Sequence, residues 1–190
     1  MTLERLEKNL IDVLAEQQIK LGYREEKVSL YYPMSSLKNL LGVQGDWEEL
    51  REALRVFTEY VELRLGKISI THNREERFCI GIPPEGSTYV HRLMEDGEIP
   101  GIDFLKEFLD TISRHDLNLQ ELVKVFQKHA REVVVEELED GDFQYLIYFK
   151  NGEPDAYRYC INFEGCHAIY HRFTAEDYAA FGFQSRKRFG

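Results

Sequence analysis

The sequence predicts an α+β protein with a winged-helix-like N-terminal half and C-terminal helices packed on a four-stranded antiparallel meander. Val28 to Ile82 reads strand, short helix, glycine-containing turn, longer helix and hairpin. Helical patterns then precede four strand-like runs that short turns connect. Pro83-Pro84 and Gly86 interrupt the chain between these halves, so we expect domains at 1–84 and 85–190.

In the first half, apolar residues at a 3.6-residue period predict an amphipathic first helix that Gly22 ends. Ser35 is expected to cap a short helix and Asp46 a longer one. Alternating apolar residues on both sides of a polar tip predict a hairpin. The expected elements are helices near 2–21, 35–41 and 46–64, and a hairpin pairing 67–72 with 77–82.

In the second half, Ser87 is expected to cap a helix that ends near Gly97, and a second helix follows at about 102–114. Asn118 and Glu121 form a capping pattern for a third. Thr174 is expected to cap a last helix before a polar tail over 184–190. The four strands are expected at 132–138, 143–150, 157–163 and 166–172, with Asp140-Gly141 and Glu164-Gly165 among their turns.

Charge and composition exclude several classes of protein. The net charge is −10, and the second half carries most of it, with 12 Lys and Arg against 20 Asp and Glu. An acidic surface repels nucleic acid and anionic lipid. The three cysteines are widely spaced, the first residues lack a signal peptide, and no apolar run reaches the ~18 residues of a membrane span. We therefore expect a cytoplasmic protein that does not bind membranes.

A DNA-binding role is the alternative that the winged-helix-like order raises. The residues that would contact DNA are Arg51, Arg55, Arg74 and Arg77. Carboxylates at 46, 48, 49 and 52 open the long helix, and Glu75 and Glu76 accompany the arginines of the hairpin tip. We expect Arg51 and Arg55 to pair with neighbouring carboxylates, which makes DNA an unlikely partner.

Cys160, Cys166, His167 and His171 lie within twelve residues and raise the question of zinc. If Glu164-Gly165 is the turn, Cys160 shares a sheet face with both histidines while Cys166 points to the other face. The two histidines are then ~13 Å apart at ~3.3 Å per residue. We expect no bound metal and a partly exposed Cys160 thiol.

The same register divides the sheet into two faces. An aromatic face with Tyr159, Ile161 and Tyr170 is expected to pack on the helices. The polar face carries Arg158, Cys160, His167 and His171, which are the candidate ligand-binding residues. A solvated sheet face is the favoured interpretation of these four residues, since antiparallel sheets commonly leave one face exposed to water.

Enzyme signatures are not found in the sequence, which lacks nucleotide-binding, metalloprotease and nucleophile-elbow motifs. His115-Asp116 is interpreted as a helix end rather than as an acid/base pair, since adjacent side chains point apart. No cofactor is expected, and the sequence favours a non-catalytic protein over an enzyme.

The opening MTLERLEKNLIDVLAEQ and the hairpin ISITHNREERFCIGIPPEG are similar to those of a bacterial family described as a domain of unknown function. The resemblance spans nearly the whole chain and implies no particular activity, substrate or functional residue. Three hypotheses remain. The first is a non-catalytic protein-interaction or regulatory protein, the second a DNA-associated regulator with a ligand-sensing C-terminal half, and the third an enzyme that uses the polar sheet face.

Overall fold

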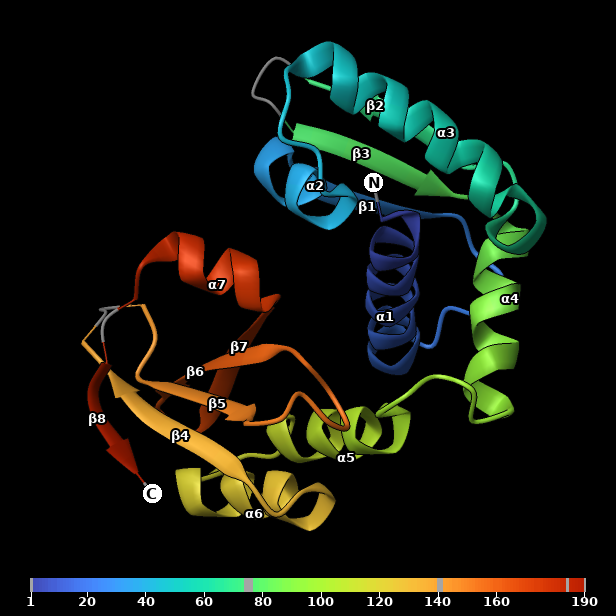
Figure 1. Cartoon of the computed structure of the whole chain (residues 1–190). Helices are drawn as coiled ribbons and strands as arrows, with labels where there is room; N and C mark the ends of the chain where they lie inside the picture. Colours follow the sequence, from blue (N-terminus) through green and yellow to red (C-terminus); the bar gives the residue numbers. More distant parts are fainter. Residues whose placement is uncertain (1, 74–76, 140–141, 184, 190) are drawn as a thin grey trace. The chain divides into compact units, whose positions relative to one another are not determined.

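The structure is a computed structural model that describes residues 2–73, 77–139, 142–183 and 185–189 (Figure 1). It is a mixed α+β protein with two antiparallel sheets. The chain folds into two compact units, residues 1–99 and 100–190. Among the helices of the described residues, none is long and apolar enough to cross a lipid bilayer.

The first unit contains a three-stranded antiparallel sheet in the order β1-β3-β2, together with helices α1 to α4 (Figure 1). The predicted helices and the predicted hairpin of this half are confirmed. Helix α4 packs against α1 and α3 and belongs to this unit. The elements are α1 (Leu3–Leu21), β1 (Val28–Pro33), α2 (Met34–Leu41), α3 (Trp47–Leu65), β2 (Ser69–His72), β3 (Arg77–Ile82) and α4 (Pro84–Glu95).

The start of α3 is fixed as the sequence predicts. The Asp46 carboxylate accepts hydrogen bonds from the backbone N–H groups of Glu48 and Glu49 at 3.0 and 3.2 Å. These donors have no partner within the helix, so a capping acceptor stabilises the helix by about 1 kcal/mol. The Asp46 cap therefore fixes the start of α3 at Trp47.

Two predicted caps are wrong. Helix α2 begins at Met34, because Pro33 in an extended conformation precedes it, and Ser35 is already inside the helix. Helix α4 begins at Pro84, and Ser87 lies one turn into it. The Ser87 hydroxyl instead donates to the carbonyl oxygen of Glu26 at 2.7 Å, so it holds a distant segment rather than a helix end.

The core of the first unit combines one face of α1, one face of α3 and the central strand β3. Burial of each such apolar side chain is worth about 1.5–3 kcal/mol. The buried Tyr32 hydroxyl on β1 donates to the Asn9 side chain on α1 at 2.8 Å, which satisfies both groups. Side chains with no exposed surface include Leu6, Leu10, Leu14, Phe57, Val61, Ile80 and Ile82.

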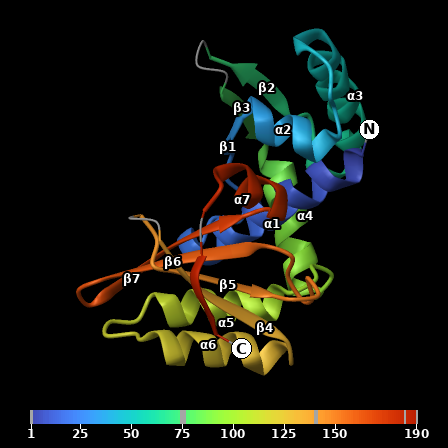
Figure 2. The same cartoon turned by 60° about the vertical axis from the view of Figure 1, so that its left-hand side comes forward.

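The second unit contains a five-stranded antiparallel sheet in the order β7-β6-β5-β4-β8. Helices α5 and α6 cover one face of this sheet and α7 lies on the other (Figure 2). The predicted four-stranded meander over β4 to β7 is confirmed. The elements are α5 (Ile102–Ile112), α6 (Leu119–His129), β4 (Val133–Leu138), β5 (Tyr145–Phe149), β6 (Arg158–Glu164), β7 (His167–Phe173), α7 (Ala175–Phe181) and β8 (Ser185–Phe189).

Residues 184–190 were expected to be a polar tail, and that expectation is wrong for the segment that the structure describes. Residues 185–189 form β8, whose backbone pairs with β4 from Val135↔Phe189 to Leu138↔Ser185. The run Ser185-Arg-Lys-Arg-Phe shows little of the alternation between apolar and polar residues that identifies a half-buried strand. An edge strand is held by backbone hydrogen bonds, which do not require particular side chains.

The β6–β7 hairpin turns one residue later than the sequence predicts. Gly165 and Cys166 are the two turn residues, and Gly165 has a φ of 61°. A glycine with positive φ at the first turn position suits a two-residue hairpin, and this choice makes Glu164 face His167. The register moves by two residues in total, so each strand residue keeps its predicted face.

Aromatic rings fill the space between α5, α6 and the sheet. The Phe108 ring lies 4.7 Å from Tyr159 and 4.9 Å from Tyr170, measured between ring centroids. The predicted packing of the aromatic sheet face on helices is therefore confirmed. Phe104, Phe126 and Phe149 complete this core. The predicted turn at Asp140-Gly141 lies outside the described residues.

Candidate functional site

The four predicted ligand-binding residues do not form one site. Cys160 pairs with His171 across the β6–β7 ladder. His167 pairs with Glu164 directly beside the hairpin turn. His167 and His171 are four residues apart on β7, which is ~13 Å along an extended strand. His167 therefore lies apart from the other three, as the predicted spacing implies.

The predicted exposure of the two thiols is reversed. Cys160 is fully buried, whereas Cys166 at the hairpin turn is exposed. The face that carries Cys160 is covered by a second hydrophobic cluster, so the expectation of a solvated face is wrong there. The cluster is made of Leu138, Leu146, Cys160 and Phe173, against which Phe143, Tyr148, Tyr178 and Phe183 pack.

Arg158 and His171 pack against aromatic rings on this covered face. The Arg158 guanidinium lies 4.0 Å from the centroid of the Tyr148 ring, and the His171 ring lies 4.0 Å from that of Phe173. Burial raises the pKa of Tyr178 to about 12, and the negative groups around it add to the effect while Arg158 opposes it. These contacts account for Arg158, Cys160 and His171 as packing residues.

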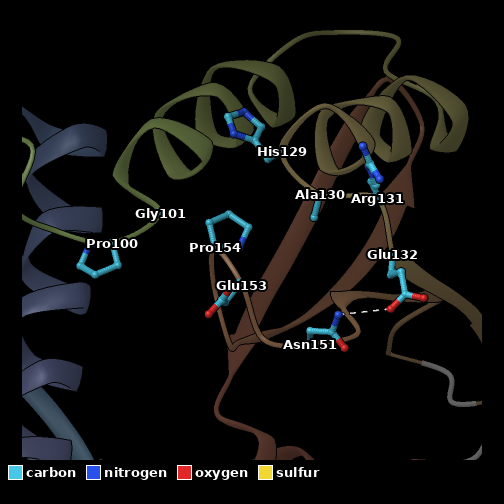
Figure 3. A pocket seen from close by; sticks show the side chains of 9 residues that line it. All are labelled: Pro100, Gly101, His129, Ala130, Arg131, Glu132, Asn151, Glu153 and Pro154. Carbon is cyan, nitrogen blue, oxygen red and sulfur yellow. Dashed lines mark hydrogen bonds between the residues drawn. The ribbon is translucent and has the colours of Figure 1, made fainter.

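A pocket of about 760 Å³ opens in the second unit, between three connections that are distant in sequence (Figure 3). Gly101 precedes α5 as its N-cap with a φ of 76°, and a Cβ added there would lie 2.7 Å from the carbonyl oxygen of Pro154. This close approach allows only glycine at 101. The pocket is lined by Pro100, Gly101, His129, Ala130, Arg131, Glu132, Asn151, Glu153 and Pro154.

Two polar side chains that line this pocket, Asn151 and His129, have hydrogen-bonding partners within the protein. The Asn151 amide donates to Glu132 at 3.2 Å, which Figure 3 draws as a dashed line. The His129 ring lies 2.9 Å from the Glu107 carboxylate, which also accepts from Lys128. Lys128 and His129 together lower the pKa of Glu107. The sequence patterns missed this pocket, because only tertiary packing brings its three loops together.

A groove of about 500 Å³ lies in the first unit between α3 and the β2–β3 hairpin. Its aromatic part is Trp47, whose ring centroid is 4.6 Å from His72 and 5.4 Å from Phe78. Trp47 is half-buried and His72 is exposed, so both remain accessible from the groove. The complete lining is Trp47, Arg51, Leu54, Arg55, Thr58, Ile70, Thr71, His72 and Phe78.

The arginines proposed for DNA contact are paired within α3, as the sequence predicts. Arg51 pairs with Glu48 at 3.0 Å. Arg55 pairs with Glu52 at 2.7 Å and with Glu59 at 2.5 Å, and both carboxylates raise its pKa.

The other two arginines belong to the hairpin. Arg77 opens β3 and is exposed, and its backbone N–H donates to the Asn73 side chain at 3.1 Å. Arg74 lies outside the described residues. Of the four arginines proposed for DNA contact, Arg51 and Arg55 therefore share the groove between α3 and the hairpin.

Three potential metal ligands come together elsewhere in the second unit. The ligand atoms of His115, Cys166 and His167 all lie within 4.8 Å of one another. His115 follows α5, while the other two belong to the β6–β7 hairpin. Two of these residues were considered from the sequence, but His115 was interpreted only as a helix end.

The fold and these surfaces define an α+β protein of two units with a groove in the first and a polar pocket in the second. A family model described as "Domain of unknown function, E. rectale Gene description (DUF3877)" matches residues 3–182. The chain therefore belongs to this family, and the resemblance stated from the sequence is confirmed. Neither a curated protein nor a solved structure was found to match it.

Proposed function

We propose that the chain is a non-catalytic interaction or regulatory protein of the cytoplasm, and that its winged-helix-like first unit binds a segment of a partner protein. The element order α1-β1-α2-α3-β2-β3 supports the winged-helix-like interpretation. In that interpretation α3 corresponds to the reading helix and the β2–β3 hairpin to the wing. Winged-helix-like units bind different partners, so the chemistry of the surface decides the function.

The observation that carries the proposal is the lining of the groove between α3 and the hairpin. It combines the rings of Trp47, His72 and Phe78 with two arginines, and the described residues that line it include no carboxylate. Aromatic and arginine side chains are enriched where proteins bind other proteins. A half-buried tryptophan beside an exposed histidine provides the apolar contact area that an inserted side chain requires.

The charges around the groove favour a peptide over duplex DNA. A DNA reader neutralises several phosphates in a row, and its affinity depends on free cations. Arg51 and Arg55 are surrounded by Glu48, Glu52 and Glu59, which repel a polyanion. A single partner carboxylate needs only one of the two guanidinium groups.

The arginine pairs can be exchanged at low cost. Arg51 and Glu48 are 69% and 65% exposed, and exposed ion pairs contribute only about 0–1 kcal/mol. A carboxylate of the partner that binds a guanidinium with two parallel hydrogen bonds replaces the internal pair. The expected partner segment therefore presents an aromatic or long aliphatic side chain next to an aspartate or glutamate.

Site-specific photo-crosslinking tests the proposal. A benzoylphenylalanine replaces Thr71 in the groove, and a matched protein carries it at Leu63, which is 99% exposed on α3 and does not line the groove. Both proteins are expressed in the source cells and irradiated. We expect a discrete protein adduct at 71 that is absent at 63, and mass spectrometry is expected to place the adduct on a peptide of the stated chemistry.

The controls separate the alternatives. An adduct at 71 that nuclease removes would support the DNA-associated regulator instead. Equal adducts at 71 and 63, or none at 71, would contradict the proposed groove. A synthetic copy of the captured peptide must also bind the purified full chain, since capture alone does not establish the site.

A further inference from the structure

His115, Cys166 and His167 form the densest group of metal-ligating side chains in the described part of the chain. All three side chains are exposed, and their ligand atoms lie within 4.8 Å of one another. The group combines two imidazoles and one thiol, with no carboxylate. It differs from the group Cys160, Cys166, His167 and His171, for which the sequence predicts no zinc.

The backbone holds the two contributing segments together. The N–H of Asp116 donates to the carbonyl oxygen of Cys166 at 3.0 Å, so the α5–α6 connection is bonded directly to the hairpin turn. Asp116 has a φ of 59° and is the one non-glycine residue with positive φ that the described residues contain. Such a conformation persists only where its surroundings stabilise it. The proximity of His115 to the hairpin therefore does not depend on its side chain alone.

The two histidine rings lie next to each other. Their centroids are 4.7 Å apart and their planes are inclined by 59°, which differs from parallel stacking. His167 is the first residue of β7 and Cys166 the last residue of the turn. Adjacent residues on a straight strand point to opposite faces, but the change of backbone direction at the turn lets these two converge.

The distances suit a transition metal after small movements of side chains. Zinc binds histidine nitrogen at about 2.0–2.1 Å and thiolate sulfur at about 2.3 Å in a tetrahedral arrangement. Ligand atoms in such a site are then roughly 3.3–3.7 Å apart. The group has to contract by about 1 Å at its widest separation, which rotation of exposed side chains allows. Calcium and magnesium prefer oxygen ligands and do not suit this set.

The other cysteine and histidine of the hairpin cannot join the group. Cys160 is fully buried in the cluster under α7, and His171 pairs with it across the ladder. His171 is also ~13 Å along the strand from His167. Within the described residues, the group of ligand atoms at these short separations therefore contains three protein ligands.

We propose that His115, Cys166 and His167 bind one zinc ion and leave its fourth coordination position open. Three protein ligands with an open position are typical of zinc sites that bind water or an external ligand. The Cys166 thiol loses its proton when it binds the metal, and the histidines bind through neutral nitrogens. The zinc would also join the α5–α6 connection to the β6–β7 hairpin by a second link beside the Asp116 hydrogen bond.

Metal titration of the full chain tests this proposal. Protein without a histidine tag is freed of metal with a chelator and titrated with Co²⁺ and then Zn²⁺. We expect one equivalent of Co²⁺ to give the thiolate charge-transfer absorption of a cysteine ligand and the visible bands of a four-coordinate ion. One equivalent of Zn²⁺ is expected to remove both signals.

Variants assign the ligands. We expect Cys166→Ser to abolish the charge-transfer absorption. We expect His115→Gln and His167→Gln each to weaken Zn²⁺ binding by at least about tenfold, since mutation of a residue that only hydrogen-bonds to a metal ligand already lowers metal affinity by that factor. The matched controls are His171→Gln and Cys79→Ser, which are expected to bind as the parent protein does. Circular dichroism of each metal-free variant verifies that it folds.

Two results would overturn the proposal. One is a parent protein that shows no saturable binding of either ion at equimolar concentration. The other is Co²⁺ or Zn²⁺ binding that Cys166→Ser leaves unchanged while His171→Gln weakens it.

Discussion

Replacement of Gly101 by alanine is expected to destabilise the second unit more than any other glycine substitution around the Figure 3 pocket. Gly101 has a φ of 76°, and an alanine in that region costs about 1–2 kcal/mol. Its Cβ would also lie 2.7 Å from the Pro154 carbonyl oxygen, which is a backbone atom that cannot rotate away. Overpacking of this kind adds about 1–3 kcal/mol. The expected total is about 2–5 kcal/mol.

Gly152→Ala is the matched control, because Gly152 lies in the same unit with a φ of 73° while its nearest neighbour is at an ordinary 3.6 Å. We expect this control to lose only the backbone share, about 1–2 kcal/mol. Native-state hydrogen exchange of the slowest β5 and β6 amides measures both losses within the second unit. Losses for the two variants that agree within about 0.5 kcal/mol would refute the role assigned to the Pro154 contact.

Three further predictions address thiols, pH and DNA. Cys166 is exposed and Cys160 is fully buried, so we expect a thiol reagent to label metal-free protein at Cys166 first; faster labelling of Cys160 would contradict the hairpin and the covered face. Lys128 and His129 lower the pKa of Glu107 from 4.5, so its ion pairs stabilise the fold above that pH and are lost as pH falls through the lower folded value. The parent protein should therefore lose more stability than Glu107→Gln between about pH 5 and pH 3 in urea titrations, by at most about 1 kcal/mol, and parallel curves would show that the pairs contribute nothing. Duplex DNA should bind only weakly at physiological salt, and tight binding that Arg77→Ala removes would reverse the preference for a protein partner.

Local signals predicted most of the helices and strands. Asp46, Asn118 and Thr174 cap α3, α6 and α7, because a short polar side chain before an amphipathic run has few other roles there. Ser35 and Ser87 show the limit of the same rule. Pro84 starts α4 instead, since proline fixes the backbone angle that a first turn requires, and the extended Pro33 directly precedes α2 at Met34.

Tertiary packing explains what the sequence did not reveal. Cys160 lies on the sheet face that the sequence predicts, but nothing in the sequence of β6 indicates that α7 and Phe173 bury it. His115 lies near Cys166 because the backbone N–H of the adjacent Asp116 donates to the Cys166 carbonyl oxygen, which joins segments that are about 50 residues apart. Contacts of this range have no periodicity or local motif, so neither the His115 group nor the Figure 3 pocket was predictable from spacing.

The affinity of the captured partner peptide for the full chain, measured by fluorescence anisotropy, tests the proposed groove most directly. Thr58 lines the groove one turn after Arg55, to whose carbonyl oxygen its hydroxyl donates. A glutamate at 58 would pair with Arg55 and repel an acidic peptide, whereas a lysine would attract it. We expect Thr58→Glu to weaken binding at least about tenfold and Thr58→Lys to preserve or strengthen it, as for any contact worth about 1.4 kcal/mol. Equal affinities for both variants and the parent protein would contradict the assignment of this groove as the partner-binding site.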